Sequence, residues 1–126
     1  MERLLWAGTG GFIGSALRYA VGGLIARARS TGSFPLETLV INVVGCVALG
    51  CLAGLAETRG FFGGATRVFL FIGVLGGFTT FSAFGYETFQ LLRDGQWVTA
   101  WGSVALQIVL GVGGVWVGQV LARSVF

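Results

Sequence analysis

The chain lacks histidine and lysine altogether, and it is poor in cysteine, proline and charge. Of its 126 residues, 2 are Cys, 1 is Pro and 10% are charged. Without histidine or a Cys-x-x-Cys pair, no ligand set for zinc, haem or an iron–sulfur cluster is visible. Cys46 and Cys51 stand five residues apart, on different faces of a helix, so we expect them not to pair with each other. We therefore expect no enzyme and no disulfide scaffold.

The chain is instead rich in apolar residues and glycine. Hydrophobic residues make up 55% of it and glycine contributes 23 residues, a composition typical of closely packed membrane helices. Crossing the ~30 Å hydrocarbon core takes about 20 helical residues. Four segments are long enough, at residues 4–26, 35–56, 68–92 and 97–122. Because the connections are short, we expect residues 1–126 to form a single four-helix transmembrane domain in an all-α integral membrane protein.

The arginines say little about orientation in the membrane. With four spans, one side holds four arginines and the other holds three, namely Arg3, Arg59, Arg67 and Arg123 against Arg27, Arg29 and Arg93. By the positive-inside rule, a difference of one arginine barely favours either orientation. Two readings stay open: one orientation set by the weak bias, or insertion both ways to give an antiparallel, dual-topology homodimer. In the second, two chains supply the inverted symmetry that larger transporters hold in one.

The third span is interrupted at residues 76–84, with the sequence GGFTTFSAF. Adjacent glycines and a Thr-Thr-Phe-Ser run weaken a helix, and lipid does not tolerate free backbone groups. We therefore expect a broken third helix that is buried in protein or lines a wet cavity. The freed carbonyls can coordinate a hard cation such as Na⁺, and such breaks commonly handle ions.

Arg18 shares a helical stripe of the first span with Gly10, Gly14 and Gly22. Glycines let another helix approach, which would place Arg18 at a protein interface or a water-filled vestibule. The alternative is an arginine that snorkels to the membrane surface.

Asn42 and Thr38 lie one turn apart on one face of the second span. The Asn amide would serve either packing between helices or a desolvated ion.

Phe81 and Phe84 share a face after the interruption. Such aromatics usually pack, but their positive ring edges can also favour an anion in a pore. Ser82 offers a hydroxyl donor beside them.

Three motifs, in this order, resemble the bacterial Fluc (CrcB) fluoride channels: GGFIGSALRY at 10–19, TLVINVVG at 38–45 and GGFTTFSAF at 76–84. The similarity spans essentially the whole chain. It implies an antiparallel, dual-topology homodimer with two pores that exports fluoride passively and confers fluoride resistance. It also implies a multi-pass protein of the bacterial inner membrane, surrounded by lipid and without a nucleic-acid partner.

The resemblance also implies roles for single residues. Asn42, Phe81 and Phe84 would line the pore, and Arg18 would stand in the vestibule. Thr38, Ser82 and Glu87 match positions linked to a polar track, and we count Ser82 and Thr38 among the pore-lining residues as well. A structural Na⁺ at the dimer centre would be held by the backbone carbonyls of Gly76 and Thr79. The fourth span departs from the family: where many members carry Tyr and Ser one turn apart, this chain has Ser103 and Gln107, which we place on the polar track.

Two other functions stay open. A small multidrug-resistance-like transporter is also a four-helix, dual-topology dimer, but it needs a membrane-embedded Glu in its first span, where this chain has Arg18. A membrane scaffold that transports nothing would leave Arg18, Asn42 and the interrupted helix without a joint purpose. We therefore predict a fluoride channel.

Overall fold

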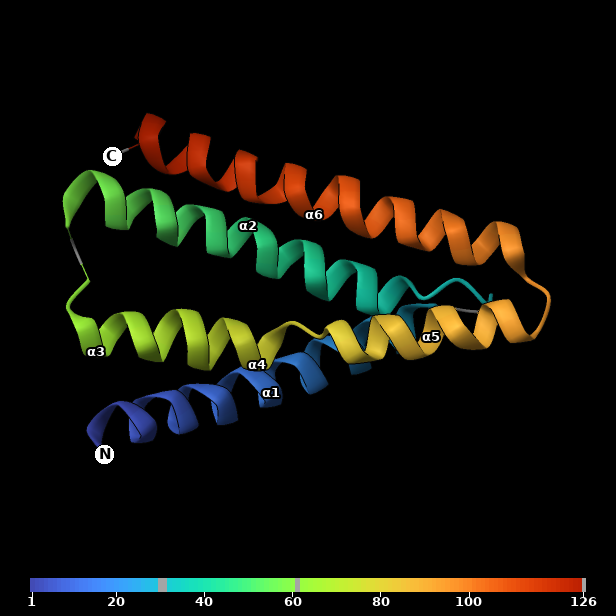
Figure 1. The fold of residues 1–126 in the computed structure, drawn as a ribbon, viewed down its shortest axis with the longest axis horizontal. Helices are drawn as coiled ribbons and strands as arrows, with labels where there is room; N and C mark the ends of the chain where they lie inside the picture. Colours follow the sequence, from blue (N-terminus) through green and yellow to red (C-terminus); the bar gives the residue numbers. More distant parts are fainter. Residues whose placement is uncertain (30–31, 61, 126) are drawn as a thin grey trace.

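The structure is a computed structural model that describes residues 1–29, 32–60 and 62–125, and it is built from helices (Figure 1). Three long α-helices are α1 (Glu2–Ala28), α2 (Leu36–Arg59) and α6 (Trp97–Val125). Between α2 and α6 come α3 (Gly64–Arg67), the π-helix η1 (Val68–Leu75), α4 (Gly76–Phe78) and α5 (Phe81–Arg93). Both chain ends lie at one end of the molecule, together with the α2–α3 connection (Figure 1).

Three helical segments of the described chain are long and apolar enough to cross a membrane: Leu36–Thr58, Gly64–Arg93 and Trp97–Val125. The α1 helix has 27 residues, about 40 Å at 1.5 Å per residue, but it is less apolar than the other three. Many large apolar side chains stay exposed, among them Phe12, Val98 and Trp116. A soluble monomer rarely exposes so much apolar surface, so the chain is a multi-pass membrane protein.

The helix ends follow from local residue chemistry. Pro35 directly precedes α2, as its fixed φ favours. Gly60 ends the same helix with φ 60°, and its N–H donates to the carbonyl of Ala56. This left-handed glycine cap satisfies a carbonyl that the helix end would leave free. The helices accordingly extend the predicted spans by a few residues and keep their order.

Non-helical backbone in the third helical run is confined to two threonines. Thr79 (φ −81°, ψ 160°) and Thr80 (φ −150°, ψ 114°) are extended, whereas Gly76 and Gly77 are helical in α4. Of the residues that we expected to weaken the helix, the two threonines lie outside it, whereas the adjacent glycines lie within it. A Cβ at Gly77 would lie 2.6 Å from the carbonyl oxygen of Gly11, so this glycine serves close packing against α1.

The helices pack as two pairs, α2 along α6 and α1 along η1 and α4. Glycines bring the backbones together in both pairs. A Cβ at Gly118 would lie 2.2 Å from the carbonyl oxygen of Val47, and one at Gly14 would lie 2.1 Å from that of Val74. Both neighbours are backbone atoms, which cannot move aside as a side chain does. The predicted close approach of another helix at Gly14 is confirmed.

Candidate functional site

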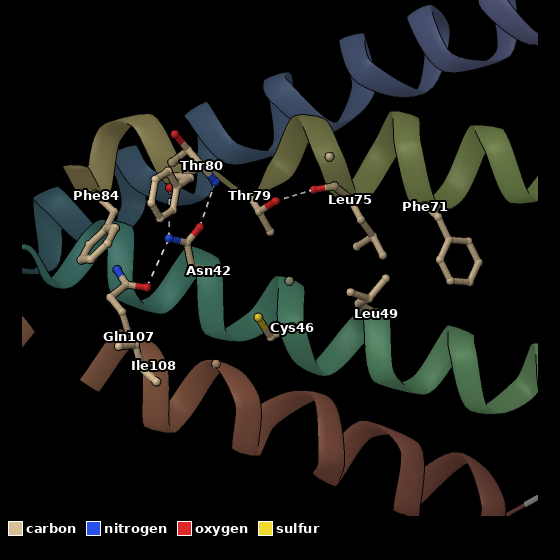
Figure 2. A pocket seen from close by; sticks show the side chains of 14 residues that line it. Asn42, Cys46, Leu49, Phe71, Leu75, Thr79, Thr80, Phe84, Gln107 and Ile108 are labelled. Carbon is tan, nitrogen blue, oxygen red and sulfur yellow. Dashed lines mark hydrogen bonds between the residues drawn. The ribbon is translucent and has the colours of Figure 1, made fainter. Parts of the chain in front are cut away.

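Asn42 of α2 holds the extended backbone in place. Its Oδ1 accepts a hydrogen bond from the N–H of Thr80 at 2.9 Å, and its Nδ2 donates to the carbonyl of Thr80 at 3.1 Å (Figure 2). One side-chain amide therefore satisfies both backbone groups of a residue outside the helix. Unpaired backbone groups at membrane depth cost several kcal/mol each, so Asn42 is what makes this stretch of backbone tolerable there.

The Asn42 amide also reaches α6, where Nδ2 donates to Oε1 of Gln107 at 3.2 Å. The Thr80 backbone decides how the amide faces, because its N–H can only donate and its carbonyl can only accept. Both N–H groups of Asn42 are therefore used, and Gln107 must present its oxygen. Within the described chain, Nε2 of Gln107 is buried and has no hydrogen-bond partner. The free amide donor at this point is thus Gln107, not Asn42.

Gln107 lines a cavity of about 400 Å³ between α2, α6 and the run from η1 to α5 (Figure 2). Phe81 and Phe84 also line it, with ring centroids 5.6 Å apart and ring planes inclined by 59°. Phe81 is 82% exposed, so the cavity is open on this side. The remaining wall is mostly apolar and includes the free thiol of Cys46. We call this space the aromatic cavity.

A second cavity of about 650 Å³ is more polar, and Thr80 borders both cavities. We call it the polar cavity. It gathers four of the predicted site residues: Arg18, Thr38, Ser82 and Glu87. Thr38, Ser82 and Glu87, which the resemblance links to a polar track, therefore line this cavity and not the aromatic cavity.

Two side chains of the polar cavity form a direct pair. The hydroxyl of Thr38, which is 4% exposed, donates to Oε1 of Glu87 at 2.7 Å. The second carboxylate oxygen of Glu87 is buried and finds no hydrogen-bond partner among the described residues. Glu87 is thus half satisfied, with one oxygen left for water or another donor.

Arg18 of α1 binds the extended backbone from the side opposite Asn42. Its Nη1 donates to the carbonyl of Thr79 at 3.4 Å, and Ser15, one turn earlier, donates to the carbonyl of Gly77 at 3.5 Å. The guanidinium therefore contacts protein, and Arg18 lines the polar cavity, which supports a place at a protein interface or vestibule over the snorkelling alternative.

Gly76 and Thr79, the predicted carbonyl ligands of Na⁺, both line the aromatic cavity. In an unbroken helix the N–H of Thr80 would bond the carbonyl of Gly76, but here it donates to Asn42. The carbonyl of Thr79 receives the Arg18 donor and keeps a second lone pair. Two hard oxygen atoms of this kind suit a hard cation, and a full shell needs further ligands from elsewhere.

Ser103 lies in neither cavity. It is 0% exposed, and its Oγ has no hydrogen-bond partner in the described part of the chain.

Thr80, which the sequence analysis did not single out as a cap, accepts a hydrogen bond from the N–H of Ala83 at 3.2 Å and so caps α5. Threonine directly before a helix is the signal for such a cap. Glu37, which also lines the polar cavity, was missed as well.

The comparison with known proteins covers nearly the whole chain. The family profile described as CrcB-like protein, Camphor Resistance (CrcB), matches residues 5–119. The chain is 44% identical over 123 residues to the fluoride-specific ion channel FluC of Methylobacillus flagellatus, covering 98% of this chain and 96% of that one. It is 42% identical over 125 residues to fluoride-specific ion channel FluC 3 of Methanosarcina barkeri, with 99% and 93% covered. A FluC of Helicobacter pylori is 43% identical over 121 residues, with 95% and 92% covered.

Proposed function

The chain belongs to the CrcB family, and we propose that it is a fluoride-selective channel through which fluoride leaves the cytoplasm passively, giving fluoride resistance. It is a channel and not an enzyme. The observation that carries this function is the pair of cavities meeting at Thr80, one polar and one lined by Phe81, Phe84 and the free amide donor of Gln107. A multidrug-transporter-like function is not favoured.

The proposed path runs from the polar cavity to the aromatic cavity. Arg18 attracts the anion into the polar cavity, where the Ser82 hydroxyl offers a donor. Beyond Thr80, the Nε2 group of Gln107 and the ring edges of Phe81 and Phe84 replace the water that fluoride sheds. Among the described residues, no positively charged side chain lines this second part. Chloride, which is larger and more weakly hydrated, fits such a donor-lined path badly.

A passive channel is sufficient for export. Fluoride enters cells from acidified medium as uncharged HF, which dissociates in the neutral cytoplasm. The negative-inside potential then drives the anion out with about 2.3 kcal/mol per 100 mV. This assignment places the protein in the inner (plasma) membrane, surrounded by lipid.

We propose an antiparallel dual-topology homodimer with a broken third transmembrane helix in each copy. The exposed ring of Phe81 and the exposed Gly76 support a partner that covers the open side of the aromatic cavity. The near-equal arginine counts of the two membrane sides support insertion both ways. A variant with two added C-terminal arginines should be impaired when it is expressed alone, and an oppositely biased variant should restore activity. Full activity from one strongly biased variant would argue against this assembly.

A Na⁺ ion between the copies is a further part of the proposal. The carbonyls of Gly76 and Thr79 from each copy would hold it, and it would supply a fixed positive charge that ties the two extended segments together. Replacing Na⁺ by a large organic cation should lower the thermal stability of the dimer. Equal stability in both salts would remove Na⁺ from the account.

A growth assay tests the proposed function in cells. A bacterial strain without its own fluoride exporter should grow at fluoride concentrations that stop it when it expresses this chain. Expression of Phe81→Ile at an equal membrane level is the matched control and should rescue poorly. Failure of the wild-type chain to rescue growth, although it is present in the membrane, would contradict the function.

A further inference from the structure

A carboxylate that the proposed path does not use lies on the polar cavity. Glu37 is in the first turn of α2 and is exposed. It lines the polar cavity together with Arg18 and Glu87. On its other side it borders a smaller cavity of about 250 Å³ that Arg29 also lines. The guanidinium of Arg29 donates to the carbonyl of Phe34, and the described residues place no cation within ion-pair distance of Glu37.

The Glu37 carboxylate packs against Gly22 of α1. A Cβ at Gly22 would lie 2.2 Å from Oε1 and 2.9 Å from Cδ of Glu37, and the three nearest atoms at that point all belong to this side chain. Gly22, unlike Gly10 and Gly14, thus makes room for a side chain and not for a helix. Arg18 lies one turn before Gly22 on the same face of α1. Because the Glu37 carboxylate packs against Gly22, it lies about one helical turn, ~6 Å along the helix axis, from the position of Arg18.

The charge lining the polar cavity is therefore mixed. One guanidinium, Arg18, stands against two carboxylates, Glu37 and Glu87, of which Glu87 accepts a hydrogen bond from Thr38. An unpaired negative charge beside an anion path lowers the local anion concentration. The range of this effect follows the Debye length, about 30 Å at 0.01 M and about 3 Å at 1 M ionic strength.

We propose that Glu37 is a rate-setting residue of the polar cavity. Its negative charge, held against Gly22, offsets the attraction of Arg18 for anions and slows the passage of fluoride into the cavity at low ionic strength. The inference rests on the proposed channel function. A negative charge ~8 Å from a fluoride ion in water lowers the local fluoride concentration about twofold. Glu37→Gln should therefore raise the fluoride flux about twofold at low ionic strength and leave it unchanged at high ionic strength.

The test is fluoride efflux per channel from liposomes, with valinomycin present and the fluoride concentration held constant. A potassium salt of a large organic anion raises the ionic strength from about 0.01 M to about 1 M. The matched control is Asp94→Asn, which removes a carboxylate from a residue that does not line the polar cavity. Asp94 directly follows α5, and α5 ends at the same end of the molecule at which α2 begins (Figure 1). Asp94→Asn and Glu37→Asp should both keep the salt dependence of the wild type.

Each other outcome contradicts a defined part of the account. Equal flux from the wild type and Glu37→Gln at both ionic strengths overturns the role of Glu37, as does a lower flux from Glu37→Gln at both, which indicates a structural role. An equal rise from Asp94→Asn overturns it too, because a general surface potential then explains the effect. A wild-type chain that releases no fluoride overturns the proposed function and this inference with it.

Discussion

The side-chain amide of Asn42 bonds both backbone groups of Thr80, accepting from its N–H at 2.9 Å and donating to its carbonyl at 3.1 Å. With a third bond to Gln107, the two N–H groups of Asn42 are fully used. In this arrangement Asn42 holds the extended backbone, and Gln107 is left with the free donor. The two amides therefore differ in what their removal should do.

Asn42→Ala should reduce both stability and flux. The change leaves the N–H and the carbonyl of Thr80 without their partners, and each unsatisfied buried group costs about 1–3 kcal/mol. We expect a clearly lower melting temperature of the purified protein in detergent, together with a loss of fluoride efflux. Cys46→Ala, one turn further along the same cavity wall, is the control and should melt like the wild type. An unchanged melting temperature for Asn42→Ala would show that the hydrogen bonds between Asn42 and the Thr80 backbone are not needed for stability.

Gln107→Glu should separate conduction from stability. A carboxylate can still accept the hydrogen bond from Asn42, but it replaces the free Nε2 donor with a negatively charged oxygen that repels an anion. Fluoride efflux should fall at least about tenfold, which corresponds to about 1.4 kcal/mol, while the protein stays folded. Efflux from Gln107→Glu at the wild-type rate would exclude Gln107 from the path.

Phe81→Ile and Phe84→Ile should each cut the fluoride flux and leave the protein folded. Isoleucine keeps most of the bulk but removes the positive ring edge that the proposed path presents to the anion. Phe12→Ile is the control, since Phe12 is a 77% exposed phenylalanine of α1 that lines neither cavity. If the pair only packs, the two changes would cost about 1–3 kcal/mol of stability, and the flux per folded protein would match the wild type.

Gly14→Ala should destabilise the protein much more than Gly8→Ala. The new methyl group at Gly14 would lie 2.1 Å from the carbonyl oxygen of Val74, whereas a Cβ at Gly8 meets nothing within 4 Å. Overpacking against backbone costs about 1–3 kcal/mol, while Gly→Ala at an open helix position gains about 0.5–1 kcal/mol. Thermal melts of the two variants side by side check this. Similar melting temperatures would mean that α1 does not lie against η1 as closely as described.

Much of the architecture follows from composition and hydropathy, because a helix that crosses the membrane must be long and apolar. The predicted spans agree with the helices to within a few residues. The sequence could not show that Gly77 serves packing while Thr79 and Thr80 carry the extended backbone. That difference depends on a contact with Gly11, 66 positions away in sequence, that no local propensity contains.

Part of the cavity lining could be predicted from the sequence, but its arrangement could not. The motifs singled out Asn42, Phe81 and Phe84, all three of which line one cavity. They could not show that Ser82 and Thr38 line a different cavity, because the sides of α2 and α5 that face each other are fixed by packing. Glu37 went unnoticed, since an acidic residue in the first turn of a helix usually has a local electrostatic role.

The most direct test of the central claim is selective efflux from liposomes that contain the purified wild-type protein. With valinomycin to carry the balancing K⁺ current, ion-selective electrodes record the release of fluoride and, in a matched preparation, of chloride. The account predicts fast release of fluoride and retention of chloride, with both ions released in full by detergent afterwards. Release of chloride at a rate comparable to that of fluoride, or retention of fluoride by liposomes that contain folded protein, would contradict it.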